Sequence, residues 1–274
     1  MSEHLDLDDY FRRIGYDGPR AATHEALRAL HRLHPKAIPF ENLDPLLGRP
    51  VRLDISSLQE KLVRSRRGGF CYEHNLLFWA VLERLGFQVS GLAARVLMNG
   101  PRDAVTPRSH MLLRIELDSE TWLADVGFGG LTQTAPLRLA TAAEQETPHE
   151  PFRLQELDGD FLVEAFAGGQ WRALYRFDLS RQHPVDYAAS SYFLSTSPDS
   201  HFRGGLICAR ADAGRRFALR GNRLAVHSPH DPTEHRFLGS AAEIVDTLDT
   251  VFHIDLPDFQ SFRQRLAQAG IVET

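Results

Sequence analysis

The first third of the chain has apolar residues at the spacing of amphipathic helices. The predicted helices cover residues 6–14, 24–33, 57 onward and 71–85. Pro35 is expected to end the second helix, and Ser57 to begin the third through a capping box with Glu60. In the fourth helix the run 76–82 is apolar on every face, so we expect this helix to be buried on most sides.

Beyond Phe87 the pattern changes to short alternating strands. The predicted strands cover residues 88–98, 109–117, 121–126, 152–157, 161–166 and 171–177. Turn pairs such as Asp118-Ser119 and Gly168-Gly169 separate neighbouring strands. This arrangement is typical of an antiparallel barrel or sandwich.

From about residue 190 strands and helices mix. A hairpin is predicted around Gly221-Asn222, a helix from the capping box at Ser240, and a last helix over 258–269. Helices come first, then strands, then both together, which predicts an α+β fold or several packed domains.

Composition narrows the class of protein further. The chain has 274 residues, enough to bury a core without disulfides, and a net charge of −5, which argues against a basic nucleic-acid surface. No apolar run reaches ~18 residues, so we expect no membrane-spanning helix. The acidic start of the sequence does not resemble a secretory signal. With two cysteines, a disulfide framework is excluded and a reduced, cytoplasmic location is expected.

Cys71 stands at an unusual place, directly before the predicted buried helix. At a helix N-terminus the unpaired N–H groups and the positive end of the dipole stabilise a thiolate. Gly68-Gly69 would let the backbone come close to a substrate carbonyl or form an oxyanion site. The alternative is a small buried hydrophobic residue, which is how we interpret Cys208 in its strand-like segment.

His110 and Asp125 are the candidates for a base and its orienting partner. With an even-length hairpin loop near Asp118-Ser119, the two side chains share one face and lie opposite each other or one diagonal step apart. An acid in an apolar run needs a partner. His110 would then deprotonate Cys71 while Asp125 holds the imidazole. The alternative is a structural hydrogen bond without catalysis.

The other histidines offer weaker signals. His227, His230 and His235 cluster with acidic residues between them, but no cysteine joins them at metal-ligand spacing, so we predict no metal site. His31 and His34 are expected on an exposed helix face.

Six segments of the sequence resemble the arylamine N-acetyltransferase family, in its bacterial form. They are Asp6–Ile14, Pro39–Leu43, Arg67–Asn75, Ser109–Met111, Asp125–Gly129 and Ser195–Phe202. They occur in the family's order and cover most of the chain. The resemblance implies three parts: a helical bundle at 1–87 carrying the cysteine, a β-barrel at 88–190 carrying the histidine and aspartate, and an α/β lid at 191–274.

The resemblance also implies an activity. Acetyl-CoA, the co-substrate, would acetylate Cys71, and an arylamine, arylhydrazine or arylhydroxylamine would take the acetyl group in a ping-pong reaction. Cys71 would be the nucleophile, His110 the base and Asp125 the orienting residue. No metal is implied.

Further roles follow from the resemblance by position. The cysteine loop would be supported by Arg67, Glu41 and Asn42. An apolar acceptor pocket would be lined by Phe40, Phe128 and Phe202. CoA would be contacted by Phe202, Ser200 and Gly129. The expected partners are therefore two small molecules, with no nucleic acid and no membrane, and the sequence does not choose between a monomer and a homo-oligomer.

Two alternatives share the Cys–His–Asp order. One is an amide synthase of the same family that closes an aryl amide on a polyketide. The other is an amide hydrolase of the papain or transglutaminase kind. The segment 197–202 favours the acetyltransferase over the hydrolase but does not separate it from the synthase.

Overall fold

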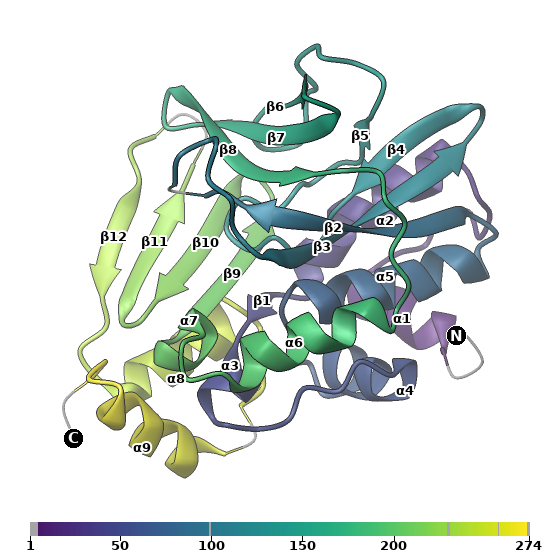
Figure 1. Cartoon of the computed structure of the whole chain (residues 1–274). Coiled ribbons are helices and arrows are strands. Elements are labelled where there is room, and N and C mark those ends of the chain that lie inside the picture. The colour runs from purple at the N-terminus through teal and green to yellow at the C-terminus, as the bar shows by residue number, and fades with distance from the viewer. Residues whose placement is uncertain (1–4, 99, 229–230, 257, 273–274) are drawn as a thin grey trace.

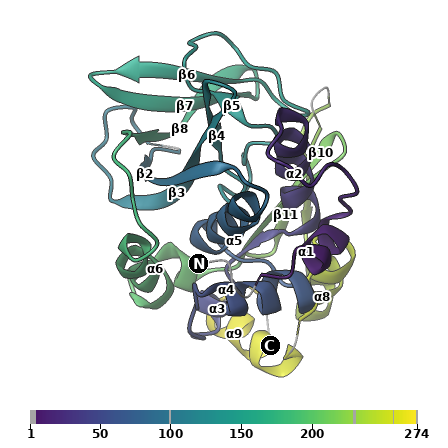
Figure 2. The ribbon, with the colours of Figure 1, turned by 90° about the vertical axis from the view of Figure 1, so that its right-hand side faces the viewer.

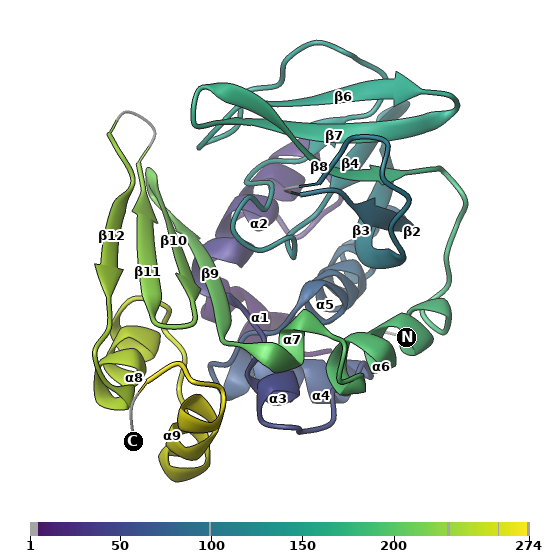
Figure 3. The same cartoon turned by 60° about the vertical axis from the view of Figure 1, so that its left-hand side comes forward.

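Two antiparallel sheets and the helices packed beside them make up the molecule (Figure 1). The computed structural model describes residues 5–98, 100–228, 231–256 and 258–272. Figure 2 and Figure 3 show the seven-stranded sheet above the N-terminal helices and the five-stranded sheet beside them. The α+β fold expected from the order of elements is confirmed.

The N-terminal part is helical, as predicted. Its helices are α1 (Leu7–Ile14), α2 (His24–Ala37), α3 (Leu43–Leu46), α4 (Ile55–Leu58), the π-helix η1 (Gln59–Arg64) and α5 (Cys71–Arg84). Every side chain of α5 from Cys71 to Leu82 is buried, in agreement with its all-round apolar pattern.

Two predicted helix boundaries were wrong. α2 continues through Pro35 to Ala37, because buried hydrogen bonds on both ring nitrogens of His34 hold the residue before the proline in the helix. The helix near residue 57 begins earlier, at Ile55, because Asp54 is its N-cap and accepts from the Ser57 N–H at 3.0 Å.

The central strands form a nearly closed antiparallel barrel. They are β2 (Gln88–Val96), β3 (Arg108–Leu117), β4 (Glu120–Ala124), β5 (Leu137–Arg138), β6 (Phe152–Leu157), β7 (Asp160–Ala167) and β8 (Gln170–Phe177), in the order β5-β4-β3-β2-β8-β7-β6. On β3 the side chains alternate. Met111 and Leu113 pack against the helices, whereas Leu112 enters the barrel core.

The last third adds a second sheet and its helices. Its elements are α6 (Asp186–Thr196), α7 (His201–Gly204), β9 (Ile207–Asp212), β10 (Arg215–Arg220), β11 (Arg223–His227), β12 (Glu234–Phe237), α8 (Ala241–Thr250) and α9 (Phe259–Gln268). The predicted hairpin at Gly221-Asn222 joins β10 to β11. The sheet has the order β1-β9-β10-β11-β12, and its edge strand β1 (Phe40–Glu41) comes from the N-terminal part.

Three apolar clusters hold these parts together, one mainly under the N-terminal helices, one inside the barrel and one under the second sheet. Leu43 and Leu46 of α3 belong to the third cluster, and Tyr187 and Leu194 of α6 belong to the first. Packing therefore crosses the proposed divisions at residues 87 and 190, and those boundaries stay a prediction. None of the helices described is long and apolar enough to cross a membrane.

Candidate active site

Cys71 is the first residue of α5. Phe70 is the N-cap, and its N–H donates to Glu73 Oε2 at 3.0 Å, so the first turn is fixed by a side chain of that same turn. Cys71 is buried, with its Sγ 3.7 Å from the carbonyl oxygen of Ser109 on β3. The predicted position of the thiol at a helix N-terminus is therefore the position it has in the structure.

His110 and Asp125 meet as the strand pattern predicts. A two-residue turn at Asp118-Ser119 joins β3 to β4, and Leu113 pairs with Ala124. This register places Asp125 one diagonal step from His110 on the same face. His110 Nε2 lies 2.7 Å from Asp125 Oδ2, and both side chains are buried.

Further groups hold Asp125. Its Oδ1 accepts from Asn75 Nδ2 at 3.1 Å and from the Gly127 N–H at 3.0 Å. Its own N–H donates to His31 Nε2 at 3.1 Å. No role was predicted for Asn75, although it lies in the cysteine segment four residues after Cys71 on the same helix face.

The prediction that His31 and His34 lie on an exposed face was wrong, because both are fully buried. His31 follows Leu27 by four residues and His34 follows Leu30 by four, and both leucines are buried. Helical spacing thus puts the two imidazoles on the apolar face of α2, and this signal could have found them.

The site has a cationic histidine beside an anionic carboxylate. Burial alone would lower the pKa of His110, but Asp125, together with a hydrogen bond to Cys71, raises it to about 10. Burial opposes ionisation of Asp125 as well, and His110 outweighs it and lowers the pKa of that carboxyl. Because Nε2 faces Asp125, Nδ1 is the ring nitrogen left for the Cys71 thiol.

Gly68 and Gly69 serve chain packing, which differs from the oxyanion role expected for them. A Cβ on Gly68 would stand 1.9 Å from the Pro39 carbonyl oxygen, and one on Gly69 would stand 2.6 Å from Glu73 Oε2. The Glu41 N–H donates to the Gly69 carbonyl at 2.8 Å. The two glycines therefore let β1 lie against the cysteine segment, and neither lines the cavity beside Cys71.

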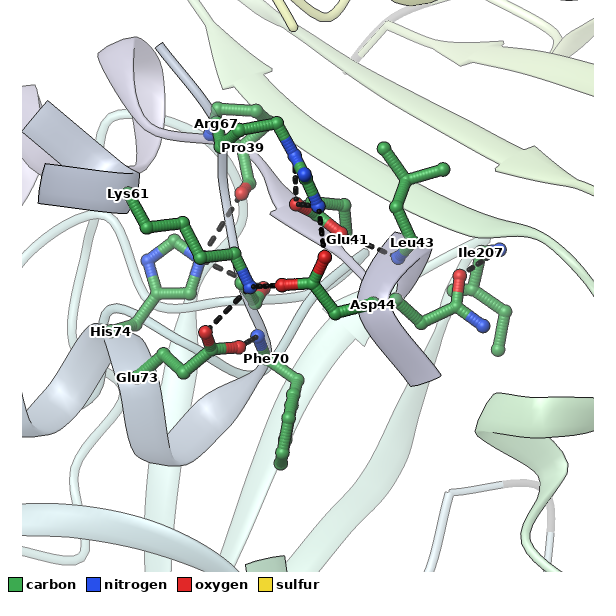
Figure 4. A network of polar contacts seen from close by, with 12 residues as sticks. Pro39, Glu41, Leu43, Asp44, Lys61, Arg67, Phe70, Glu73, His74 and Ile207 are labelled. Carbon is green, nitrogen blue, oxygen red and sulfur yellow. Dashed lines mark hydrogen bonds and ion pairs between the residues drawn. The ribbon is translucent and has the colours of Figure 1, made fainter. Parts of the chain in front are cut away.

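An ion cluster of five side chains, Glu41, Asp44, Lys61, Arg67 and Glu73, lies behind the cysteine segment (Figure 4). Arg67 Nη2 is 2.8 Å from Glu41 Oε1 and 3.1 Å from Asp44 Oδ1. Lys61 Nζ is 2.6 Å from both Asp44 Oδ2 and Glu73 Oε1. Of these residues, only Arg67 and Glu41 had been given a role from the sequence.

The ion cluster reaches the first turn of α5 through Glu73. This carboxylate accepts from the Phe70 N–H with one oxygen and pairs with Lys61 through the other. Burial raises the pKa of Glu73 to about 7, against the lowering effect of Lys61. Figure 4 shows this connection from Lys61 through Glu73 to Phe70.

Asn42 joins the N-terminal part to the segment 202–207. Its Nδ2 donates to the carbonyl oxygens of Phe202 and Gly205, each at 2.7 Å, and its Oδ1 accepts from the Ile207 N–H at 2.8 Å. The predicted support by Asn42 thus acts on the segment 202–207, and the cysteine loop is held by the ion cluster instead.

A second buried network runs behind the site. His74 Nε2 lies 3.1 and 3.0 Å from the carbonyl oxygens of Pro39 and Gly69, so it must carry the proton, and His74 Nδ1 accepts from His34 Nε2 at 2.9 Å. His34 Nδ1 then accepts from the Tyr10 hydroxyl at 2.8 Å. Burial lowers the pKa of both histidines, to about 4 for His74, in accord with this neutral chain.

A cavity of about 230 Å³ opens beside Cys71 and His110. The predicted acceptor and CoA residues Phe40, Phe128, Phe202 and Gly129 line it. Ser200 does not line it, because its hydroxyl donates to the Leu194 carbonyl and caps α7. The lining residues for which the sequence predicted no role are Val96, Met98, Ser109, Leu194, His201, Ile207 and Arg220. A larger cavity, about 550 Å³, lies at the ion cluster and has charged and serine walls, which do not suit an apolar ring.

The histidine cluster considered as a metal site has other partners. His227 bonds to Thr233, and His235 contacts Arg223, while His230 lies outside the described residues. Within the described ranges no group of three or more acidic, histidine or cysteine side chains could hold a metal ion. Cys208 is buried on β9, where burial raises the pKa of its thiol well above the usual value.

Comparison with known proteins identifies the class. The model of the N-acetyltransferase family matches residues 23–261. The arylamine N-acetyltransferase of Escherichia coli is 40% identical over 253 residues, which cover 92% of this chain and 90% of that protein. The structure of Mycobacterium marinum arylamine N-acetyltransferase has a TM-score of 0.93 at 42% identity, covering 96% of this chain and 99% of that one.

A structure of the Mycobacterium marinum enzyme in complex with CoA is equally similar, with a TM-score of 0.92 at 41% identity over 96% of this chain and 99% of that one. The chain belongs to the arylamine N-acetyltransferase family and is an acyltransferase. The resemblance drawn from the six sequence segments is confirmed.

Proposed function

We propose that this chain transfers an acetyl group from acetyl-CoA to an arylamine, arylhydrazine or arylhydroxylamine, through a thioester on Cys71. The observation that carries this proposal is the buried contact of Cys71 with His110, and of His110 with Asp125, beside a cavity with aromatic walls. A thiol activated by a histidine is the nucleophile of acyl transfer. That a relative was solved in complex with CoA supports CoA as the leaving group.

In the first half-reaction the Cys71 thiolate attacks the acetyl carbonyl carbon. The bond between that carbon and the CoA sulfur breaks, and His110, protonated at neutral pH because its pKa is about 10, gives its proton to the departing CoA thiolate. The products are acetyl-Cys71, CoA and a neutral His110. Asp125 keeps the imidazole oriented throughout.

In the second half-reaction the acceptor nitrogen attacks the thioester carbonyl. His110 takes the proton that the nitrogen loses, and the Cys71 thiolate leaves, so the thiolate and the protonated His110 of the first step are regenerated. The rings of Phe40, Phe128 and Phe202 form apolar walls that suit a flat aromatic acceptor. Burial of Cys71 limits access of water to the thioester, which favours transfer over hydrolysis.

The test is intact-mass spectrometry of the protein mixed with acetyl-CoA alone. We expect one acetyl group per chain, on Cys71, and its loss when an arylamine is added. Cys208→Ala, the matched control at the other cysteine, should acquire the acetyl group normally, and Cys71→Ala should not.

Three outcomes would contradict the proposal. Product formation without a covalent adduct would mean direct transfer in a ternary complex. An adduct discharged to water equally fast with and without amine would mean a hydrolase. An adduct formed from a polyketide thioester but not from acetyl-CoA would mean an amide synthase.

A further inference from the structure

The cavity beside Cys71 has an uneven charge. Of its described lining residues, Arg220 is the one arginine or lysine, and none is an aspartate or glutamate. This is notable in a chain that has 36 acidic residues against 31 basic ones. The remaining walls are aromatic, aliphatic or glycine, apart from Cys71, Ser109 and two histidines.

The second sheet directs Arg220 at this cavity. Arg220 is the last residue of β10 and pairs with Ile207, which also lines the cavity. Cross-strand partners project to the same face, so both side chains face the active site. Arg216, four residues earlier on β10, shares that face.

The two arginines differ in their partners. Arg216 is buried, with Nε 2.9 Å from Glu150 and Nη2 2.9 Å from the Thr132 carbonyl oxygen. Arg220 is exposed, and within the described part of the chain its guanidinium has neither an ion pair nor a hydrogen bond. Arg216 therefore holds the sheet against the barrel loop, whereas the charge of Arg220 is available to a ligand.

The neighbours of Arg220 leave this charge uncompensated. Desolvation in the cavity wall and the positive charge of Arg220 both lower the pKa of His201, so that imidazole is neutral at pH 7. His110, the other histidine of the wall, is cationic and is already paired with Asp125. Arg220 is therefore a localised positive charge at the cavity in a protein of net negative charge.

We propose that Arg220 binds an anionic oxygen group, a carboxylate or a phosphate, of a molecule held in the Cys71 cavity. A guanidinium matches the geometry of either group with two parallel hydrogen bonds. The anion has two possible sources, a carboxylate on the aromatic acceptor or a phosphate of CoA. The inference rests on the proposed acetyl transfer and adds the charge class of one of its substrates.

The experiment compares Arg220→Gln with wild type on two substrate pairs, each pair differing in charge. The acceptors are para-aminobenzoate and its neutral analogue para-aminobenzamide, with acetyl-CoA as donor. The donors are acetyl-CoA and the phosphate-free para-nitrophenyl acetate, with the neutral acceptor. Arg220→Lys keeps the charge, and Arg236→Gln, an exposed arginine of β12 that does not line the cavity, is the matched control.

If the anion is the acceptor carboxylate, Arg220→Gln lowers kcat/KM about tenfold for para-aminobenzoate and leaves para-aminobenzamide unchanged. If it is a CoA phosphate, kcat/KM falls about tenfold for acetyl-CoA and stays unchanged for para-nitrophenyl acetate. Arg220→Lys should recover part of the loss, and Arg236→Gln should show none. The proposal would be overturned if kcat/KM of Arg220→Gln equalled the wild-type value for all four substrates. It would also be overturned if kcat/KM fell by the same factor for all four.

Equilibrium binding separates this inference from the proposed reaction. Calorimetry on Cys71→Ala protein, with and without Arg220→Gln, measures the Kd of CoA and of para-aminobenzoate in the absence of turnover. If the Kd weakens about tenfold without Arg220 while the wild-type chain forms no acetyl-Cys71 in the mass-spectrometric test, the proposed function is refuted and the anion site stands. A Kd independent of Arg220 for both ligands would refute the anion site alone.

Discussion

Asp125 is a buried carboxylate whose charge depends on a few contacts. His110 pairs with Oδ2 at 2.7 Å, and Asn75 and the Gly127 N–H donate to Oδ1. These contacts offset the cost of burying an anion. They also decide the histidine tautomer, because an acceptor at Nε2 requires a proton there.

Replacing Asp125 with asparagine tests this role. The amide can offer its N–H to His110, which favours the tautomer with Nε2 unprotonated and leaves Nδ1 unable to act as a base. We expect kcat to fall by about three orders of magnitude or more, with the fold retained. Steady-state turnover and circular dichroism measure the two effects.

Asp178→Asn is the control for that substitution, since Asp178 pairs with Arg108 away from the cavity. It should leave kcat within about twofold, because such outer ion pairs contribute little. Turnover of Asp125→Asn near the wild-type rate would assign the orienting role to another group.

At the scale of single residues, the sequence predicts those contacts that depend on short-range periodicity. The period of two along a hairpin was enough to bring His110 and Asp125 to one face. Asn75 was missed because the two hydrogen bonds that its Nδ2 donates, to Asp125 and to the Met111 carbonyl, link segments whose contact no local pattern encodes. Arg220 was missed for the same reason, since its pairing with Ile207 determines where it points.

At the scale of elements, ionic contacts from a neighbouring helix fix the first turn of α5. η1 provides Lys61, which lies between Asp44 and Glu73, and Glu73 accepts the Phe70 N–H. The helix turn that presents Cys71 is therefore fixed by an ammonium group on another element. Removing that group leaves two buried carboxylates with less compensation.

Lys61→Met is expected to destabilise the protein by about 3 kcal/mol, because one partner of a buried ion pair is lost. The free energy of unfolding in urea measures this loss. In a double-mutant cycle with Glu73→Gln we expect a coupling of about 1 kcal/mol or more, since the two side chains touch. Lys36→Met, at an exposed lysine 3.8 Å from Asp212, should change stability by less than about 0.5 kcal/mol. Strictly additive effects of the Lys61 and Glu73 substitutions would contradict the linkage.

Element boundaries were predictable where the cap is local. Ser240 caps α8, as the sequence predicts, and α9 follows its cap Asp258, the first residue of the predicted last helix. The passage of α2 through Pro35 was not predictable, because it depends on Tyr10 and His74 binding His34 from other helices. Tertiary contacts here override a local breaking signal.

At the scale of the whole molecule, buried neutral histidines link stability to pH. Burial lowers the pKa of His31 and His74 to about 4, and that of His34 well below its usual 6.5. Between pH 6.5 and 4 the unfolded chain binds protons at these positions that the folded chain does not. Their contribution is thus complete above pH 6.5 and decreases by about 1.4 kcal/mol per pH unit for each group as the pH falls. Glu73, whose pKa is raised to about 7, and His110, whose pKa is raised to about 10, act in the opposite direction, with His110 acting mainly above pH 6.5.

We therefore expect Tm to fall by about 5 °C or more between pH 6.5 and 5.5, measured by scanning fluorimetry at constant ionic strength. A His74→Gln variant should show a smaller drop relative to its own value at pH 7.5, because one linked group is gone. His183→Gln, at an exposed histidine, should show the full drop. A Tm that is constant or higher at pH 5.5 would contradict this linkage.

The order of helical, strand and mixed parts could be predicted from the sequence because each has its own hydrophobic period. That β1 joins the second sheet, and that α3 packs in the apolar cluster under it, could not. A two-residue strand such as β1 has no readable pattern, and its pairing of Phe40 with Ala209 joins positions far apart in the chain.

The same pairing has a consequence for synthesis of the protein. Chains emerge from the ribosome N-terminus first. The α5 segment and both barrel residues His110 and Asp125 are therefore made well before β9. Until Ala209 reaches Phe40, and Ile207 reaches the Asn42 amide, the cavity lacks the wall to which Ile207 and Arg220 belong. The nascent chain thus carries its reactive thiol for about half of translation without a finished binding site, and only the last third of the polypeptide completes it.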